Sequence, residues 1–533
     1  LEQALQQSDR SNRRERIDIW FSDEVLSAAA WAYAAMPALY QKCLLAVREA
    51  GLSVREWQRQ VRARAQELHG GRSFSRDLSF ALGDAPLPRG RIPRGYLLTE
   101  HGTYREMVGA DGEIQRRLVV PAPVLVSAIL QDLDDGSQGL RLSWRPPGSP
   151  VWSLLEVDRG VALNARKIVE LASQGFPVDS TVAAELVRYL HVFEAANADV
   201  LPVHRVSSHL GWQGEDGRWG FLWGTTLLTG EPEGGEPHSP RPGSAVQFRP
   251  RAEGDAQLAA GFHARGTLQG WLAAMAPVAS YPRVKLGLYA AFVPPLLRIL
   301  GAPNHVLDFA NQTSVGKTIT ARLCASVWGD PDEKSGRCAL GTWDATGVRI
   351  ERASAVLHDL PLILDDTKRA KHPDFVAKVL YAVTSGQGRG RGSVRGLALV
   401  GTWRTVLIST GEQRATAFTQ DGGTRARTLE ITGLPFERQD PATGRLVDRL
   451  NAAILHHYGH AGPLFVQWLI RHRSEWQAFR RRYEELAESY AEHQSGPVRR
   501  IAQMLAAIRV AAELVHRAFE ETGTPLPFPL ADP

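Results

Sequence analysis

The chain has 533 residues, 44% of them apolar and 22% charged, and a net charge of +5. This composition excludes a disordered protein, and the charge permits an anionic partner without requiring one. The three cysteines lack paired spacing, which excludes a disulfide framework, and we expect a reducing, cytoplasmic compartment. The best apolar run, residues 286–302, is interrupted by two prolines and an arginine, so we expect no contact with a membrane.

Residues 1–80 predict a helical N-terminal region. Apolar residues recur there at helical spacing, and Ser53 is a suitable N-cap for a helix over 54–68. Residues 81–100 are rich in glycine and proline, which is typical of a boundary between domains.

Residues 88–228 predict an α+β domain. In its first half the apolar residues recur with a period of two, which is typical of strands. The apolar segments 124–133 and 140–144 flank an Asp-Asp-Gly-Ser turn, which indicates an antiparallel hairpin. Residues 229–255 are polar and rich in glycine and proline, so we expect a linker or a mobile loop. We expect a core domain over 260–440 after it.

The strongest chemical signal is an apolar strand, 305–310, followed by a turn and a helix that opens with Gly-Lys-Thr. Turn amides and a helix N-terminus suit a phosphate, a lysine reaches the β and γ oxygens, and the threonine hydroxyl ligates Mg²⁺. The residues expected to bind ATP are Asn311, Gln312, Thr313, Ser314, Val315, Gly316, Lys317, Thr318 and Ile319. Asn311 stands where this motif usually has glycine, and a chance Gly-Lys-Thr at a helix start is the alternative.

A second apolar strand ends in Asp365 and Asp366, 47 residues after Thr318. In a P-loop ATPase Asp365 would hold Mg²⁺ together with Thr318, and Asp366 would polarise the attacking water. Glutamate is common at the second position, and aspartate is one methylene shorter. Two solvated carboxylates at a strand end are the alternative, but both motifs in this order indicate an ATPase.

A third strand, residues 403–408, is followed by polar residues at its tip. In P-loop ATPases of the AAA+ type such a residue helps to orient the water, and the candidates are Ser409 and Thr410. Glu412 is either a further member of the site or a loop cap.

The segment between the second and third strands is basic. Residues 375–411 contain no acidic residue, and the glycine-rich stretch 386–396 holds Arg389, Arg391 and Arg395. We expect these arginines to contact a nucleic-acid backbone. A solvated or ATP-facing loop is the alternative.

Further arginines follow the third strand. Arg414, Arg425 and Arg427 are candidates for an arginine finger that completes the ATP site of a neighbouring subunit. An arginine at a strand edge is the alternative. Residues 445–533 predict a C-terminal helical domain whose first helix covers 450–470.

These motifs together resemble a family of helicase-like P-loop ATPases from phages and mobile elements, formerly described as a domain of unknown function. That family is similar to ring helicases of the minichromosome-maintenance kind. The resemblance covers roughly residues 88–440. It rests on Gly95-Tyr96, 209–212, 314–318, 326–329, Thr342-Trp343 with Thr346, 359–366, 386–396 and 403–412.

The resemblance implies an α/β, AAA+-like core that assembles into a homo-oligomer, which in that family is a hexameric ring. It implies ATP and Mg²⁺ as cofactors and ATP-driven movement on single-stranded or forked DNA in mobile-element replication. Two other functions remain open: an ATP-gated DNA-binding switch or loader that does not unwind, and a defence ATPase that does not act on nucleic acid.

Overall fold

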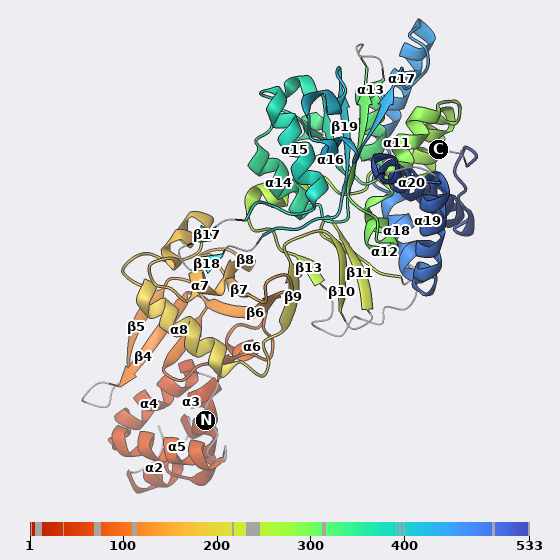
Figure 1. Cartoon of the computed structure of the whole chain (residues 1–533). Coiled ribbons are helices and arrows are strands. Elements are labelled where there is room, and N and C mark those ends of the chain that lie inside the picture. The colour runs from red at the N-terminus through yellow and green to blue at the C-terminus, as the bar shows by residue number, and fades with distance from the viewer. Residues whose placement is uncertain are drawn as a thin grey trace. The chain divides into compact units, whose positions relative to one another are not determined.

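The chain forms two compact units, residues 1–204 and 205–533, which Figure 1 shows in a computed structural model. The structure describes residues 1, 3–5, 13–35, 37–68, 76–108, 114–215, 218–230, 246–311, 316–390, 392–393, 396–397, 400–492 and 496–530. The boundary between the units falls inside the segment 88–228 that the sequence groups as one domain. Within the described ranges, every helix is too short or too polar to cross a bilayer.

Four helices form the first part of unit 1. They are α2 (Arg13–Trp20), α3 (Asp23–Ala35), α4 (Pro37–Glu49) and α5 (Val54–Leu68). The bounds of α5 confirm the helix expected over 54–68, and the Ser53 hydroxyl accepts from the Glu56 amide at 3.3 Å as its cap. The Trp57 indole N–H donates to the Trp20 carbonyl at 2.7 Å. This bond joins α5 to the last residue of α2 in the core of the bundle.

The rest of unit 1 is mostly antiparallel sheet. Its elements are β1 (Arg76–Asp77), α6 (Leu78–Ala81), β2 (Arg91–Ile92), β3 (Tyr96–Thr99), β4 (Gly102–Val108), β5 (Ile114–Val120), β6 (Val124–Asp132), β7 (Gln138–Trp144), β8 (Ser153–Asp158), α7 (Arg159–Ala162), η1 (Ile168–Gln174) and α8 (Ala183–Ala196). β6 and β7 pair antiparallel, which confirms the expected hairpin. The Tyr189 hydroxyl on α8 donates to the Val124 carbonyl at 2.6 Å and fixes this helix on the sheet.

Unit 2 opens with short strands and helices that support its main sheet. After β9 (Val203–Ser207), which crosses the boundary along the chain, come β10 (Gly211–Glu215), β11 (Arg218–Trp223), β12 (Thr226–Leu228), β13 (Val246–Phe248), α9 (Glu253–Ala259), α10 (Leu268–Met275), η2 (Ala276–Ser280), α11 (Pro282–Ala291) and α12 (Pro294–Leu300). Two buried indoles attach the strands to the core. Trp212 donates to the Pro295 carbonyl at 2.8 Å, and Trp223 donates to the Trp328 carbonyl at 2.7 Å.

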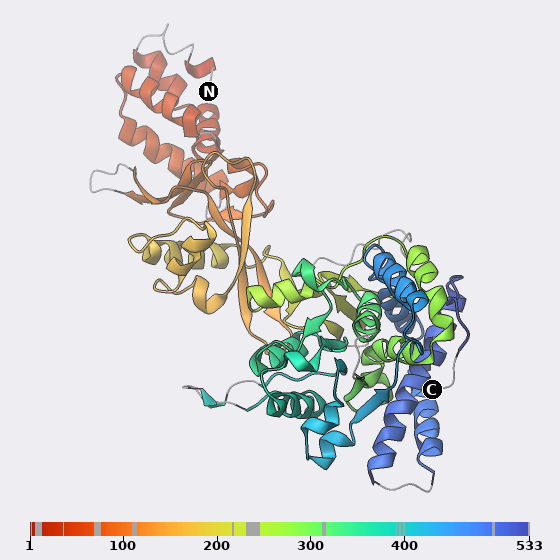
Figure 2. The ribbon, with the colours of Figure 1, turned by 90° about the horizontal axis from the view of Figure 1, so that it is seen from above.

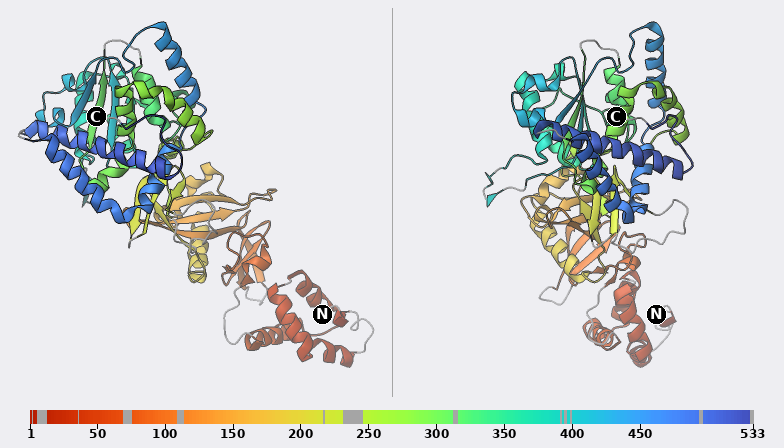
Figure 3. Two further views of the ribbon diagram at one scale, coloured as in Figure 1. Left: turned by 90° about the vertical axis from the view of Figure 1, so that its right-hand side faces the viewer. Right: turned by 45° about the vertical axis from the view of Figure 1, so that its right-hand side comes forward.

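The centre of unit 2 is a five-stranded parallel sheet. Its strands are β14 (His305–Ala310), β15 (Gly341–Thr342), β16 (Leu362–Asp365), β19 (Val406–Gly411) and β20 (Thr428–Thr432), in the order β15-β16-β19-β14-β20. Helices α14 (Gly347–Val356) and α15 (Pro373–Ser385) lie on one face, and α11 and α13 (Lys317–Ser326) lie on the other (Figures 1 and 3). The fold is therefore mixed α/β with a parallel sheet, and all five carboxyl ends meet at one edge.

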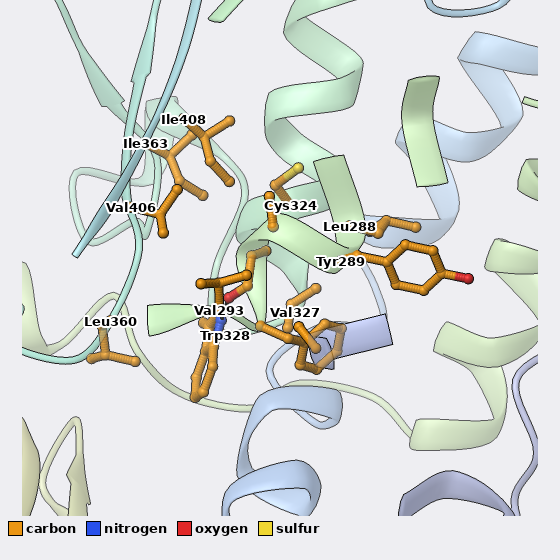
Figure 4. Close-up of a cluster of buried hydrophobic side chains, with 14 of the residues drawn as sticks. Leu288, Tyr289, Val293, Cys324, Val327, Trp328, Leu360, Ile363, Val406 and Ile408 are labelled. Carbon is orange, nitrogen blue, oxygen red and sulfur yellow. Dashed lines mark hydrogen bonds between the residues drawn. The ribbon is translucent and has the colours of Figure 1, made fainter. Parts of the chain in front are cut away.

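The core beneath that edge is tightly packed. In Figure 4, Cys324 of α13 lies between Ile363 of β16 and Ile408 of β19 on one side and Leu288 of α11 on the other. All four side chains are fully or almost fully buried. Because Cys324 anchors the later turns of α13 in this cluster, the first turn of the helix has a fixed position above the strand ends.

The C-terminal part is helical, with α17 (Pro441–Ile454), α18 (Ala461–Arg471), η6 (Arg473–Glu475), α19 (Trp476–Tyr490) and α20 (Gly496–Glu521). Helices α19 and α20 run side by side (Figure 2). The single helix expected over 450–470 is wrong, because the chain turns between α17 and α18. Gly459 has a φ of +74°, and a Cβ there would lie 2.1 Å from the His263 carbonyl oxygen, so only glycine permits this turn.

Candidate functional site

The carboxyl end of β14 leads into the first turn of α13. β14 is buried along its whole length, which confirms the strand expected over 305–310, and the Asn311 amide donates to the Gly411 carbonyl at 3.1 Å. Gly316 starts the helix with a φ of +98°, and a Cβ there would lie 2.6 Å from the Phe436 ring. This position therefore requires glycine. The expected ligands Gln312, Thr313, Ser314 and Val315 lie outside the described residues.

Lys317 is the first residue of α13 and its side chain lies in the site. The residue is only 7% exposed, and its ammonium group donates to the Asn311 carbonyl. Desolvation lowers the pKa of Lys317, whereas the carboxylates of Glu412, Asp366, Asp365 and Asp308 raise it. The structure thus holds a cation at the strand ends, within the field of four acidic residues. Ile319 points into the core instead.

Asp365, at the end of β16, joins α13 to β19. The Thr318 hydroxyl donates to its carboxylate at 3.1 Å, and the Thr410 hydroxyl donates to its Oδ1 at 2.5 Å. Burial raises the pKa of Asp365, and these two hydrogen bonds oppose the rise. Three elements far apart in the sequence therefore place two hydroxyls and one carboxylate at a single point.

Asp366 has an unusual backbone conformation, with a φ of +63°. Its amide donates to the Thr410 Oγ1 at 2.9 Å, and its Oδ1 accepts from the Lys368 amide at 3.1 Å as the cap of η4 (Thr367–Arg369). A non-glycine residue in this region is strained and persists only where its surroundings hold it. The half-buried carboxylate is thus fixed beside Asp365.

Glu412 is a third carboxylate at this edge, after Asp365 and Asp366. It follows β19 directly, its side chain is 46% exposed, and it pairs with Lys368 Nζ at 3.3 Å. Among the carboxylates that raise the pKa of Lys317, its effect is the largest. From the sequence alone Glu412 is either a further member of the site or a loop cap, and its position after a strand tip is the signal for the first.

The two polar candidates on β19 have different surroundings. Thr410 contacts Asp365, whereas Ser409 is fully buried and is the register partner of Asp308 on β14. Successive side chains of a strand point to opposite faces, so both residues cannot reach the same site. The strand itself covers Val406–Gly411 rather than the expected 403–408, because the Trp403 amide is taken by the Gly386 carbonyl at 2.9 Å.

Asp308 is a buried carboxylate that sequence analysis missed. It accepts from the Ala415 amide at 2.8 Å, and its register partner on β20, Glu430, accepts from the Thr416 amide at 3.0 Å. Both carboxylates therefore hold the start of η5 (Ala415–Phe418), directly after Arg414. An aspartate inside an apolar run gave no sequence signal of this role.

The Asp308 carboxyl predicts a pH-dependent stability. Burial raises its pKa from 3.8 to about 7, so the folded protein keeps a proton that the unfolded chain releases near pH 4. The stabilisation is full below pH 4 and is lost as the pH rises to 7, by up to about 4 kcal/mol. Asp308→Asn keeps an acceptor for the Ala415 amide and cannot ionise. Urea unfolding should show this variant to be more stable than the unaltered protein at pH 8, with a smaller gain at pH 5. Equal stability at pH 8 would contradict the prediction.

The three candidate finger arginines lie at different edges. Arg414 is exposed at the carboxyl edge, after β19. Arg425, in α16 (Gly422–Arg425), is exposed, and Arg427 donates to the Gly423 carbonyl at 3.5 Å; both precede the amino end of β20. Within the described part of the chain, none of the three is paired with Lys317 or Asp365. Only Arg414 is therefore at the same edge as these two residues.

The glycine-rich stretch 386–396 that holds the three arginines, here called the arginine-rich segment, begins at the opposite edge of the sheet. α15 ends at Ser385, and two short strands, β17 (Gly392–Ser393) and β18 (Gly396–Leu397), pair antiparallel beyond it. Arg389 is exposed at the base, and its amide donates to Glu351 Oε1 at 3.2 Å. Arg391 and Arg395 lie outside the described residues.

A buried asparagine clamps the base of this segment. Asn304 Nδ2 donates to the carbonyls of Val383 and Trp403 at 3.3 and 3.2 Å, and its Oδ1 accepts from the Thr405 amide at 3.0 Å. The Trp403 indole also donates to Val383, at 3.0 Å. Asn304 directly precedes β14, so the base of the arginine-rich segment is fixed to the strand that leads to Lys317.

Comparison with known proteins agrees with this arrangement of the fold. A search of curated protein sequences finds no match. A solved structure described as the active helicase Cch of SCCmec type IV matches with a TM-score of 0.60 at 19% identity, over 80% of this chain and 74% of that one. This likeness shows a shared fold. A family model described as a domain of unknown function, DUF927, matches residues 96–400. Since this match covers more than half of the 533 residues, the chain belongs to the DUF927 family.

Proposed function

We propose that this protein is an ATP-dependent helicase or translocase that acts on single-stranded or forked DNA in the replication of a mobile element. The observation that best supports this function is the meeting of Lys317, Thr318, Asp365 and Thr410 at the carboxyl edge of a parallel sheet. The shared fold with a protein described as an active helicase is consistent with it.

The residues at this edge fit ATP and Mg²⁺. The Thr318 hydroxyl and the Asp365 carboxylate are 3.1 Å apart, and both are oxygen ligands of the kind that Mg²⁺ uses. Gly316 and the first turn of α13 offer amides to phosphate, and Lys317 supplies the positive charge. Asn311 contacts Lys317 through its backbone carbonyl, a group that glycine would offer equally. When bound, Mg²⁺ would neutralise charge on the phosphates.

The chain's own residues then have separate tasks. Lys317 exchanges its bond to the Asn311 carbonyl for phosphate oxygens. Thr410 orients Asp365 and, through the Asp366 amide, the neighbouring carboxylate. Asp366 orients the attacking water and accepts its proton.

The remaining parts of the proposal concern assembly and DNA. The core forms an AAA+-type ring, a hexamer, in which an arginine of one subunit completes the site of the next. Arg414 is the favoured finger because it lies exposed at the carboxyl edge, ahead of Arg425 and Arg427. Arg389, Arg391 and Arg395 contact the DNA backbone.

Strand displacement from a forked duplex tests this function. The purified protein should release the labelled strand with ATP but not with ADP. Single-stranded DNA should raise its ATPase rate. Particle images should show rings. DNA-stimulated ATPase without displacement would indicate a switch or loader instead. An ATPase rate unaffected by DNA would indicate a defence ATPase.

A further inference from the structure

A hollow of about 410 Å³ lies beside the base of the arginine-rich segment. Its walls come from α14, the last two turns of α15, residues 387–389 and the segment that leads into α16. This volume is within the range of roughly 300–1,000 Å³ that is usual for small-ligand sites. The hollow is remote from the ATP site, since α15 starts near Asp365 and ends at the opposite edge of the sheet.

Tyr381 provides an aromatic surface in this hollow. The residue is 60% exposed, although its neighbour on α15, Leu380, is fully buried. A tyrosine this exposed leaves most of its ring available to a flat ligand. Aromatic rings of this kind bind nucleic-acid bases by stacking, without sequence preference.

Charged groups surround the ring in a pattern that suits a nucleotide. Lys378 lies one helical turn before Tyr381, and Arg389 also lines the hollow; both are exposed. Asp421 lines the hollow as well. Its Oδ2 accepts from the Thr424 amide and hydroxyl, both at 2.6 Å, and these bonds lower its pKa. Two cations suit phosphates, and an ionised acceptor suits the amino group of a base.

The hollow is held in shape before any ligand binds. Gly388 approaches α14 so closely that a Cβ would lie 2.5 Å from Glu351 Oε1. The Gly388 amide donates to the Gly401 carbonyl at 2.8 Å, and Glu351 Oε1 also accepts from the Arg389 amide. Binding here would therefore cost little ordering of the protein.

We propose that this hollow binds one base of the DNA strand, stacked on Tyr381, with the adjoining phosphates on Lys378 and Arg389. This inference rests on the proposed function. It adds base stacking to the proposed contact between the arginine-rich segment and the DNA backbone. A free nucleotide offers the same chemistry, so the two ligands must be separated by experiment.

Fluorescence anisotropy with labelled oligonucleotides tests the proposal on the full chain. Tyr381→Ala should raise the Kd for a thymidine oligonucleotide by roughly tenfold, the size expected for one base–aromatic stack. Its Kd for an abasic oligonucleotide of the same length should not change, and Tyr381→Phe should bind like the unaltered protein. Tyr490→Ala, at another exposed tyrosine, is the matched control and should have no effect.

Each other outcome overturns the inference. If Tyr381→Ala binds the thymidine oligonucleotide normally, or loses both oligonucleotides equally, no base stacks on this ring. If only free thymidine monophosphate responds to Tyr381→Ala, the hollow is a site for a free nucleotide. If the unaltered protein binds neither oligonucleotide, the proposed DNA function itself is wrong, which distinguishes that failure from failure of the hollow alone.

Discussion

Lys317→Ala is expected to lower the rate of ATP hydrolysis by at least about 100-fold, the scale of losing a preorganised charge at a reacting phosphate. The loss should include weaker nucleotide binding. The charges of Asp365, Asp366 and Glu412 act on Lys317, and its ammonium group offsets them. Without it, three carboxylates repel the phosphates that the site must accept. Steady-state ATPase assays and titration with a fluorescent ATP analogue would measure both effects.

Two further variants make this prediction specific. Lys317→Arg should also be inactive, because the lysine is only 7% exposed and the larger guanidinium does not fit the same space. Lys334→Ala removes an exposed lysine on η3 (Glu333–Ser335) and should leave the rate unchanged. An active Lys317→Ala protein, or equal losses at Lys317 and Lys334, would rule out the proposed ATP site.

Asp366→Asn is expected to lower kcat for ATP hydrolysis by roughly 100-fold or more while nucleotide binding is retained, as for loss of a general base. Asparagine keeps the size of the side chain and can still cap the Lys368 amide, so the strained turn at φ +63° should survive. Rapid-quench measurements of hydrolysis, with binding measured separately, would distinguish the chemical step from affinity.

Glu412→Gln is the matched comparison, because Glu412 is the other carboxylate at this edge that is not assigned to Mg²⁺. Its charge is already engaged by Lys368 at 3.3 Å, so we expect less than about a tenfold loss of kcat. If Glu412→Gln has the larger effect, the base is Glu412 and Asp366 is a structural cap of η4. Equal losses would mean that the two carboxylates orient the water together.

The strand-turn-helix around Lys317 could be predicted from the sequence because its signals are local. An apolar run, a turn and Gly-Lys-Thr follow one another within 14 residues, and an apolar run ends at Asp365 in the same way. The structure places both at one edge of a parallel sheet, as such connections require. The helix over 54–68 and the hairpin of β6 and β7 were predictable for the same reason.

Features that depend on distant contacts could not be predicted. The choice between Ser409 and Thr410 depends on which of them points to the side of the sheet where Asp365 meets Thr318. The start of β19 depends on a bond from the Trp403 amide to the Gly386 carbonyl. The role of Asp308 depends on the Ala415 amide, 107 residues later in the chain. In each case the partner is supplied by tertiary packing rather than by the neighbouring sequence.

The Asn304 clamp has a mechanical consequence. β14 has six residues and a length of roughly 20 Å. Asn304 directly precedes its first residue. Asn311, whose carbonyl accepts from Lys317, directly follows its last. The strand is buried between β19 and β20 and therefore behaves as a stiff rod without a hinge. In the proposed mechanism, a displacement at the Lys317 end of this strand therefore reaches the base of the arginine-rich segment at the other end. In that mechanism the length of a stroke is set by movement of the whole sheet, because β14 is paired with a strand on each side.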